Sequence, residues 1–186
     1  MIKQFTPTAL LAVACAGLFF GEATAQQMVS RSAEVTLLST TPIEDIEGLN
    51  TQGSAIFDAS NGDIAIQVPI LGFHFKRALL EEHFNENYME SDKFPKALFR
   101  GTVAGWNARP LEGETARVTA SGAFTVHGVE TQRDFQGTLR MEGGALILVC
   151  NFEVQPEDHG IEIPGVVRQQ IASVIQITVH AKLLPR

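Results

Sequence analysis

Basic residues are few in this chain of 186 residues, which has 14 Lys and Arg against 21 Asp and Glu and a net charge of -7 at pH 7. Binding to nucleic acid draws its affinity from clustered basic side chains that neutralise phosphates. The acidic balance therefore argues against a nucleic-acid partner, and it disfavours an anionic membrane surface. Charged residues make up only 19% of the chain and apolar residues 45%, which favours a folded core over disorder.

Cysteine is also scarce, and one of the two cysteines falls in a segment that we expect to be removed. Residues 1–25 contain one Lys, an apolar run over 9–20 and the small residues Ala23 and Ala25, a pattern typical of a secretory signal peptide cleaved after Ala25. The run is shorter than the roughly 20 apolar residues that span a bilayer. A lipoprotein processed at Cys15 is the less favoured alternative. The sequence thus predicts a periplasmic or secreted protein with one domain over 26–186 and no transmembrane segment.

Cleavage would leave Cys150 as the only thiol, so no intramolecular disulfide is expected. Cys150 lies on one face of an alternating stretch over 146–152, and we interpret it as a small buried apolar residue. A catalytic thiolate is the alternative, but no basic residue stands near it in the sequence.

Short catalytic and metal-binding motifs are missing from the sequence as well. It has no Gly-x-Ser-x-Gly elbow, no His-Glu-x-x-His pair and no Gly-rich phosphate loop. The five His residues are far apart and do not have the spacing of metal ligands. We expect a protein that is not an enzyme and has no cofactor or metal. A small envelope enzyme with His83 or His127 as its base is the alternative, because a site can be assembled only in space.

Alternation of apolar and polar residues is the main pattern that the sequence does contain, and it is typical of β-strands. Gly143-Gly144 suits a tight hairpin, and a bulge near Gly72 would explain why the large residues shift register to Phe73 and Phe75. Several strands are apolar on both faces, which favours a closed, all-β, antiparallel eight-stranded barrel over a sandwich. The eight predicted strands are 33–39, 52–58, 63–70, 97–106, 115–127, 132–141, 145–154 and 173–184.

One segment, about 76–90, has helical instead of alternating periodicity. It lacks Gly and Pro, and it repeats large side chains at helical spacing, namely Leu79, Leu80, His83, Phe84 and Tyr88. The pattern predicts one amphipathic helix that covers the outside or the mouth of the barrel. A short helical turn is expected near 165–171, just before the last strand.

Two motifs of the chain resemble those of YceI-like proteins. The stretch from His83 to Phe99 resembles the family's segment in which a helix runs into an aspartate, an aromatic residue and a proline before a Phe-containing strand. The stretch from Gly122 to Val129 is similar to the family's strand that ends in His-Gly-Val. The likeness extends from about Glu34 to Leu183. This resemblance implies a lipocalin-like barrel that binds a polyisoprenoid or isoprenoid-quinone-like lipid in its lumen.

The aromatic residues agree with an apolar lumen, since the chain has twelve Phe against one Trp and one Tyr. Phe supplies apolar area without a polar tip that needs a partner. Close packing of these side chains into a solid core is the alternative. A lipid tail in an open lumen would gain about 0.8 kcal/mol for each buried methylene. The predicted ligand-binding residues are Phe73, Phe75, Leu80, His83, Phe84, Tyr88, Phe94, Phe99, Phe124, His127, Phe135 and Phe152.

Polar contacts to a ligand's headgroup have several candidates. His83 and His127 are candidates at the barrel mouth, although such residues more often satisfy backbone groups or carboxylates. Guanidinium groups match the geometry of a diphosphate, but scattered arginines are commonly just solvated. The four candidate arginines are Arg77, Arg100, Arg109 and Arg133.

The leading hypothesis is a non-enzymatic binding protein that carries or sequesters an isoprenoid-type lipid, either a polyprenyl chain or an isoprenoid quinone. A barrel that serves only as a scaffold for protein–protein interaction is a further alternative. A homodimer that covers an open barrel mouth is compatible with the sequence.

Overall fold

The computed structural model describes residues 27–106 and 113–186, and these residues form nine β-strands. The predicted signal peptide and Arg109 lie outside the described residues. The strands are β1 (Gln27–Thr40), β2 (Asp45–Asp58), β3 (Asp63–Pro69), β4 (Phe73–Phe75), β5 (Lys96–Val103), β6 (Thr115–Val126), β7 (Val129–Glu142), β8 (Ala145–Val154) and β9 (Ile175–Pro185).

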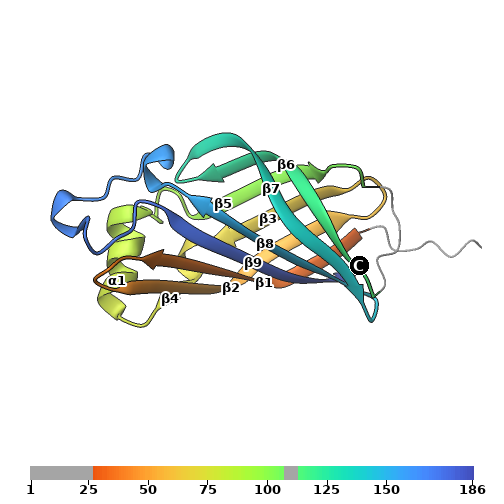
Figure 1. Cartoon of the computed structure of the whole chain (residues 1–186), viewed down its shortest axis with the longest axis horizontal. Helices are drawn as coiled ribbons and strands as arrows, with labels where there is room; N and C mark the ends of the chain where they lie inside the picture. Colours follow the sequence, from red (N-terminus) through yellow and green to blue (C-terminus); the bar gives the residue numbers. More distant parts are fainter. Residues whose placement is uncertain (1–26, 107–112) are drawn as a thin grey trace, which may run out of the picture.

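The strands form one antiparallel sheet in the order β1-β9-β8-β7-β6-β5-β3-β2-β4, and pairing of β1 with β2 closes it into a barrel (Figure 1). The predicted eight-stranded antiparallel barrel is confirmed, and β4 is one additional short strand on the edge of β2. Each predicted strand overlaps an observed one, but β1 and β2 extend well beyond 33–39 and 52–58. Closure leaves the barrel with an inside and an outside, and burial accordingly alternates along strands such as β2.

A 3-10 turn, η1 (Ile70–Gly72), separates β3 from β4 where a bulge was predicted. β3 pairs with the second half of β2, and β4 pairs with its first half. The buried amide of Asn50 holds this corner, since its Nδ2 donates to the carbonyl of Pro69 at 2.7 Å. A Cβ at Gly72 would lie 2.8 Å from the Nδ2 of the same amide, so a larger residue there would displace the Asn50 side chain.

The predicted helix is present but shorter than 76–90. α1 (Ala78–His83) continues directly into a π-helical turn, η2 (Phe84–Tyr88), and Glu90 follows with a positive φ of 41°. The connection from β8 to β9 contains two 3-10 turns, η3 (Pro156–His159) and η4 (Gly165–Val167), and the second lies where a short helical turn was predicted. In the described part of the chain, no helix is long and apolar enough to cross a bilayer.

The two ends of the barrel differ. We call the end that carries α1 and the β8–β9 connection the open end, and the end that carries the β7–β8 hairpin the closed end (Figure 1). Gly143 and Gly144 form this hairpin with φ of 58° and 80°, as predicted. The closed end is filled by large, fully buried side chains, among them Phe57, Leu146 and Leu183.

Trp106 completes the packing of the closed end. Its ring packs edge-on against Phe57 with centroids 4.9 Å apart, and its Nε1 donates to the carbonyl of Ala59 at 2.8 Å. Gly62 makes room for it, because a Cβ there would lie 2.7 Å from the Cβ of Trp106. Side chains thus seal this end, and any internal space has to lie toward the other.

Candidate functional site: an apolar cavity in the barrel

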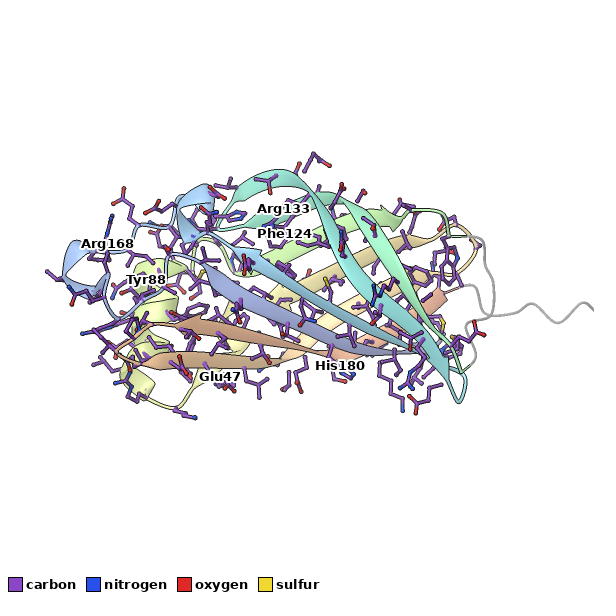
Figure 2. All side chains as sticks on the ribbon, in the orientation of Figure 1. Glu47, Tyr88, Phe124, Arg133, Arg168 and His180 are labelled. Carbon is purple, nitrogen blue, oxygen red and sulfur yellow. The ribbon has the colours of Figure 1, made fainter. Side chains whose placement is uncertain are left out.

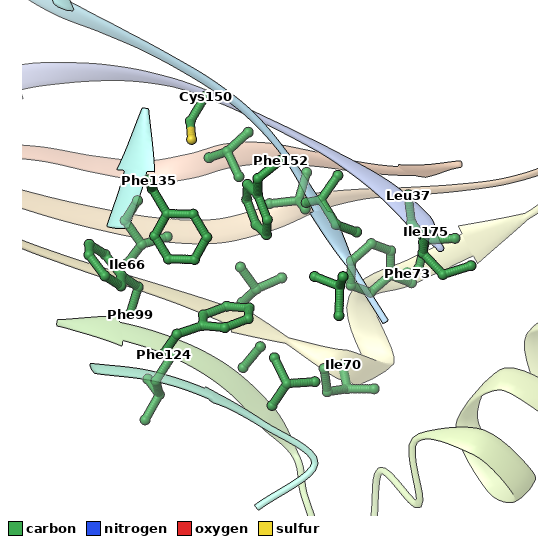
Figure 3. Close-up of a pocket in the computed structure, with 18 of the residues that line it drawn as sticks. Leu37, Ile66, Ile70, Phe73, Phe99, Phe124, Phe135, Cys150, Phe152 and Ile175 are labelled. Atoms are coloured by element: carbon green, nitrogen blue, oxygen red, sulfur yellow. The ribbon is translucent and has the colours of Figure 1, made fainter. Parts of the chain in front are cut away.

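A cavity of about 250 Å³ lies inside the barrel and extends to the open end (Figure 3). It is lined by residues of all nine strands, by η1, α1 and η2, and by the β8–β9 connection. Nearly all of these side chains are aliphatic or aromatic. A single water needs only about 10–15 Å³ on this measure, and a cavity without polar partners stays dry. The cavity is therefore suited to an apolar molecule.

Four phenylalanines form a cluster in the wall of the cavity. The ring of Phe135 lies 5.1 Å from Phe99, 5.2 Å from Phe124 and 4.5 Å from Phe152, measured between centroids. These separations and tilts are the ones that aromatic pairs prefer. A second aromatic group, nearer α1, contains Phe84 with Phe73 at 5.4 Å and Phe75 at 5.0 Å.

The structure brings nine of the twelve predicted ligand-binding residues onto the cavity wall. Their contact with a ligand stays a prediction. The nine are Phe73, Phe75, Leu80, Phe84, Tyr88, Phe99, Phe124, Phe135 and Phe152.

The other three predicted residues, His83, Phe94 and His127, do not line the cavity. His127 follows β6 with a positive φ of 50°, and its two ring nitrogens face the carbonyl of His159 at 3.1 Å and the carboxylate of Glu90 at 3.2 Å. The ring of Phe94 packs against that of His127 at 4.4 Å, on the turn beside Gly128. His127 therefore ties the β6–β7 turn to neighbouring segments, and neither nitrogen points into the cavity.

Many aliphatic wall residues were not among the predicted site residues. Most lie on strands, where the alternation that predicted the strand also gives the inward face, as for Ile64, Ile66 and Val68. Ile161, Ile163 and Ile171 come from the β8–β9 connection, which has no regular periodicity from which their direction could be read. This connection thus contributes apolar residues to the cavity at the open end.

Cys150 lies on the cavity wall, half-buried, and its Sγ donates to the carbonyl of Gln136 at 3.2 Å. Burial raises the pKa of the thiol to about 11. The side chain therefore stays protonated near neutral pH, which agrees with the interpretation as a small apolar residue and not with a catalytic thiolate. Burial also raises the pKa of Tyr88 at the mouth of the cavity.

Other polar groups are distributed around the open end. Arg77 forms an ion pair with Glu44, and Arg100 points to solvent. Arg133 is half-buried and lies over two rings of the phenylalanine cluster. Across residues 27–106 and 113–186, no three His, Cys, Asp or Glu side chains gather in a way that would hold a metal ion.

The family model of the YceI-like domain matches residues 26–183, which is most of the chain. The protein belongs to the YceI-like family. The resemblance of its two motifs to this family is thereby confirmed, and it extends through all strands of the barrel. No curated protein sequence matches this YceI-like chain.

Solved structures share the fold of this YceI-like protein at low sequence identity. A polyisoprenoid binding domain from Saccharophagus degradans, implicated in plant cell wall breakdown, has a TM-score of 0.73 and 12% identity, and the match covers 87% of this chain and 99% of that one. BcnA from Burkholderia cenocepacia has a TM-score of 0.66 and 16% identity over 81% of this chain and 95% of its own. A YceI protein from Campylobacter jejuni has a TM-score of 0.54 and 9% identity, with 97% of both chains covered.

Proposed function

We propose that this YceI-like protein binds an isoprenoid-type lipid, either a polyprenyl chain or an isoprenoid quinone, inside its barrel. The observation that carries the proposal is the cavity of about 250 Å³ with its almost wholly apolar wall. The relative from Saccharophagus degradans, described as a polyisoprenoid binding domain, supports the same ligand class.

The energetics of the cavity favour an apolar chain over water. Wall residues that face empty space lose van der Waals partners, and water cannot replace them because it finds no hydrogen-bond partners there. Each methylene that enters gains about 0.8 kcal/mol. A branched isoprenoid chain can fill the irregular space between the phenylalanine cluster and the group around Phe84.

The role that we propose is carriage or sequestration of the lipid in the cell envelope, without catalysis. The signal-peptide pattern of residues 1–25 supports a periplasmic or secreted location. A binding role also fits the placement of His83 and His127, because neither of the two candidate bases reaches the cavity. A reaction on a bound lipid would need a polar group at the cavity, and the wall offers chiefly the raised-pKa groups Cys150 and Tyr88.

A homodimer that covers the open end stays a prediction. Exposed apolar side chains lie around this end, among them Ile43 in the β1–β2 turn, Leu79 on α1 and Val166, which is 90% exposed. Light scattering on the purified protein, with and without lipid, measures whether the chain pairs.

Mass spectrometry of an organic extract tests the proposed function. The mature protein is purified gently from the envelope of a bacterium that makes isoprenoid quinones, and its lipids are extracted. We expect one polyprenyl or quinone species in a stoichiometric amount. A protein that repeatedly retains no lipid, and that takes up none when lipid is added, would contradict the proposal.

A further inference from the structure

The barrel wall is split between β7 and β8 toward the open end. The two strands pair only over Gly137–Glu142 and Ala145–Cys150. Beyond this stretch the two strands do not pair with each other, over residues 129–136 of β7 and 151–154 of β8. There β7 still pairs with β6, and β8 still pairs with β9. Figure 1 shows the two strands diverging from the hairpin toward the open end. Along the split, each of the two strands therefore has an edge that is not paired with the other.

A polar hollow occupies this split, in contrast to the apolar cavity behind it. Charged and polar side chains from β7, β8 and η3 face each other across the hollow. Its lining residues are Thr131, Arg133, Glu153, Gln155, Asp158, His159 and Val174.

Arg133 lies between the hollow and the cavity. Position 133 is two residues from Phe135, so both side chains point to the same face of β7. The guanidinium carbon lies 5.2 Å from the ring centroid of Phe135 and 5.8 Å from that of Phe124, which stands beside it in Figure 2. Both rings belong to the cavity wall. The cation thus packs against two rings that line the cavity.

The guanidinium of Arg133 retains unused donors. It has five N–H groups in a rigid plane. Among the described residues, its recorded hydrogen bond is from Nη2 to the backbone carbonyl of Glu153 at 3.0 Å, and no carboxylate lies within ion-pair distance. Packing on the two rings occupies a face of the group and leaves N–H edges for an acceptor.

His159 also lines the hollow. The residue is 1% exposed, and its ring stands edge-on to Phe124 with centroids 5.5 Å apart. The imidazole therefore packs, like Arg133, against a ring of the phenylalanine cluster.

We propose that Arg133 anchors the oxygen-bearing head of the bound lipid in the split between β7 and β8, while the apolar chain lies in the cavity. This inference rests on the proposed function. A hydrogen bond from a charged donor is about twice as strong as a neutral one, so Arg133 selects lipids whose chain ends in an oxygen acceptor. Glu153 and Asp158 line the same hollow, which favours a neutral hydroxyl or carbonyl over a phosphate.

Binding of three matched probes to Arg133→Gln tests the proposal. The probes are geranylgeraniol, geranylgeranyl phosphate and the hydrocarbon that lacks the oxygen, each titrated into lipid-stripped protein. We expect Arg133→Gln to weaken the binding of geranylgeraniol roughly tenfold and to leave the affinity for the hydrocarbon unchanged. Arg133→Lys keeps the charge but loses the planar fork, so it should restore only part of the affinity. Arg140→Gln is the matched control, because Arg140 pairs with Glu142 near the closed end.

The outcomes separate the two proposals. A loss of affinity for the oxygen-bearing probes, but not for the hydrocarbon, supports Arg133 as the anchor. A larger loss for the alcohol than for the phosphate indicates a neutral natural head, and the reverse indicates an anionic one. An equal loss for all three probes, or no loss, would overturn the anchor and leave Arg133 as a tie across the split wall. If the unmodified protein binds none of the probes, the proposed function fails first.

Discussion

The two ends of the barrel are built from the same kinds of residue, yet one is solid and the other hollow. At the closed end, Phe57, Leu146 and Leu183 have almost no exposed surface and Trp106 fills the remaining space. At the open end, seven phenylalanines surround a space of about 250 Å³. Apolar composition alone therefore does not decide whether a barrel is filled. The difference comes from which side chains face one another across the barrel.

From this comparison we infer that packing at the closed end stabilises the fold, whereas the cavity toward the open end binds the ligand. Interiors of proteins are close-packed, and each lost contact is felt in the free energy of unfolding. A cavity is tolerated at the open end because the closed end is well packed. Substitutions of the same chemistry should then change stability by different amounts in the packed part and at the cavity.

Truncation of one phenylalanine at each end should give the largest difference. Phe57→Ala removes a fully buried ring together with its contact to Trp106, so we expect the free energy of unfolding to fall by about 3–5 kcal/mol. Phe152→Ala only enlarges an existing cavity. The free energy of unfolding should fall by clearly less, because the Phe152 ring has no neighbours on the side that faces the cavity. Urea unfolding of both variants measures the two losses in free energy of unfolding. Equal losses would contradict the inference that the two ends have different roles.

Alkylation of Cys150 tests whether the cavity is dry. With a pKa of about 11, the thiol is ionised in only about one of ten thousand molecules at pH 7. We expect iodoacetamide to react roughly a hundredfold more slowly than with the urea-unfolded chain, and the rate to rise with pH. Labelling followed by intact-protein mass spectrometry gives the rates. Similar rates in folded and unfolded protein would mean that water reaches the thiol freely.

Enlargement of one alanine in the packed core and of one on the cavity wall should separate stability from binding space. Ala181 is fully buried and does not line the cavity, so Ala181→Phe should overpack the core and cost about 1–3 kcal/mol. Ala120 lines the cavity, and Ala120→Phe should be neutral or stabilising because the new ring fills empty space. Thermal unfolding compares the pair, and a loss in Ala120→Phe as large as in Ala181→Phe would show that no such space exists.

Acidification should weaken the open end before the closed end. Burial lowers the pKa of His159 below its usual 6.5, so its neutral form is favoured in the folded protein. The corresponding stability is present above pH 6.5 and is lost as the pH falls toward the folded pKa. We expect unfolding midpoints to decrease below pH 6.5 and His159→Gln to reduce this dependence.

The emission of Trp106 reports the closed end during the same titration. It should stay constant over the pH range in which His159 takes up a proton, because Trp106 lies among residues of the opposite end. A change in its emission at the same pH as the loss of stability would show that the two ends respond together.

The barrel was predictable because alternation at period two is a local property of each strand. The eight alternating segments predicted the strands. Apolar residues on both faces of several strands predicted that the sheet closes into a barrel. The same alternation places Arg133 on the face of Phe135, a relation that the sequence contains and that site prediction did not use. Position along a strand can thus reveal a polar residue on the inner face.

Other features depend on contacts between distant residues. Phe94 and His127 lie on turns, where alternation no longer tells direction, and they pack on each other instead of on the cavity. The sealing of one end by Trp106 depends on Gly62 and Ala59, more than 40 residues away in sequence. The split between β7 and β8 follows from how far two strands pair, which no local pattern indicates.

Binding of geranylgeraniol to Ala120→Phe, compared with the unmodified protein, tests whether the lipid occupies the cavity. We expect the unmodified protein to bind one lipid per chain and Ala120→Phe, folded and at least as stable, to bind it far more weakly. Undiminished binding by a stable Ala120→Phe variant would mean that the lipid does not occupy the cavity.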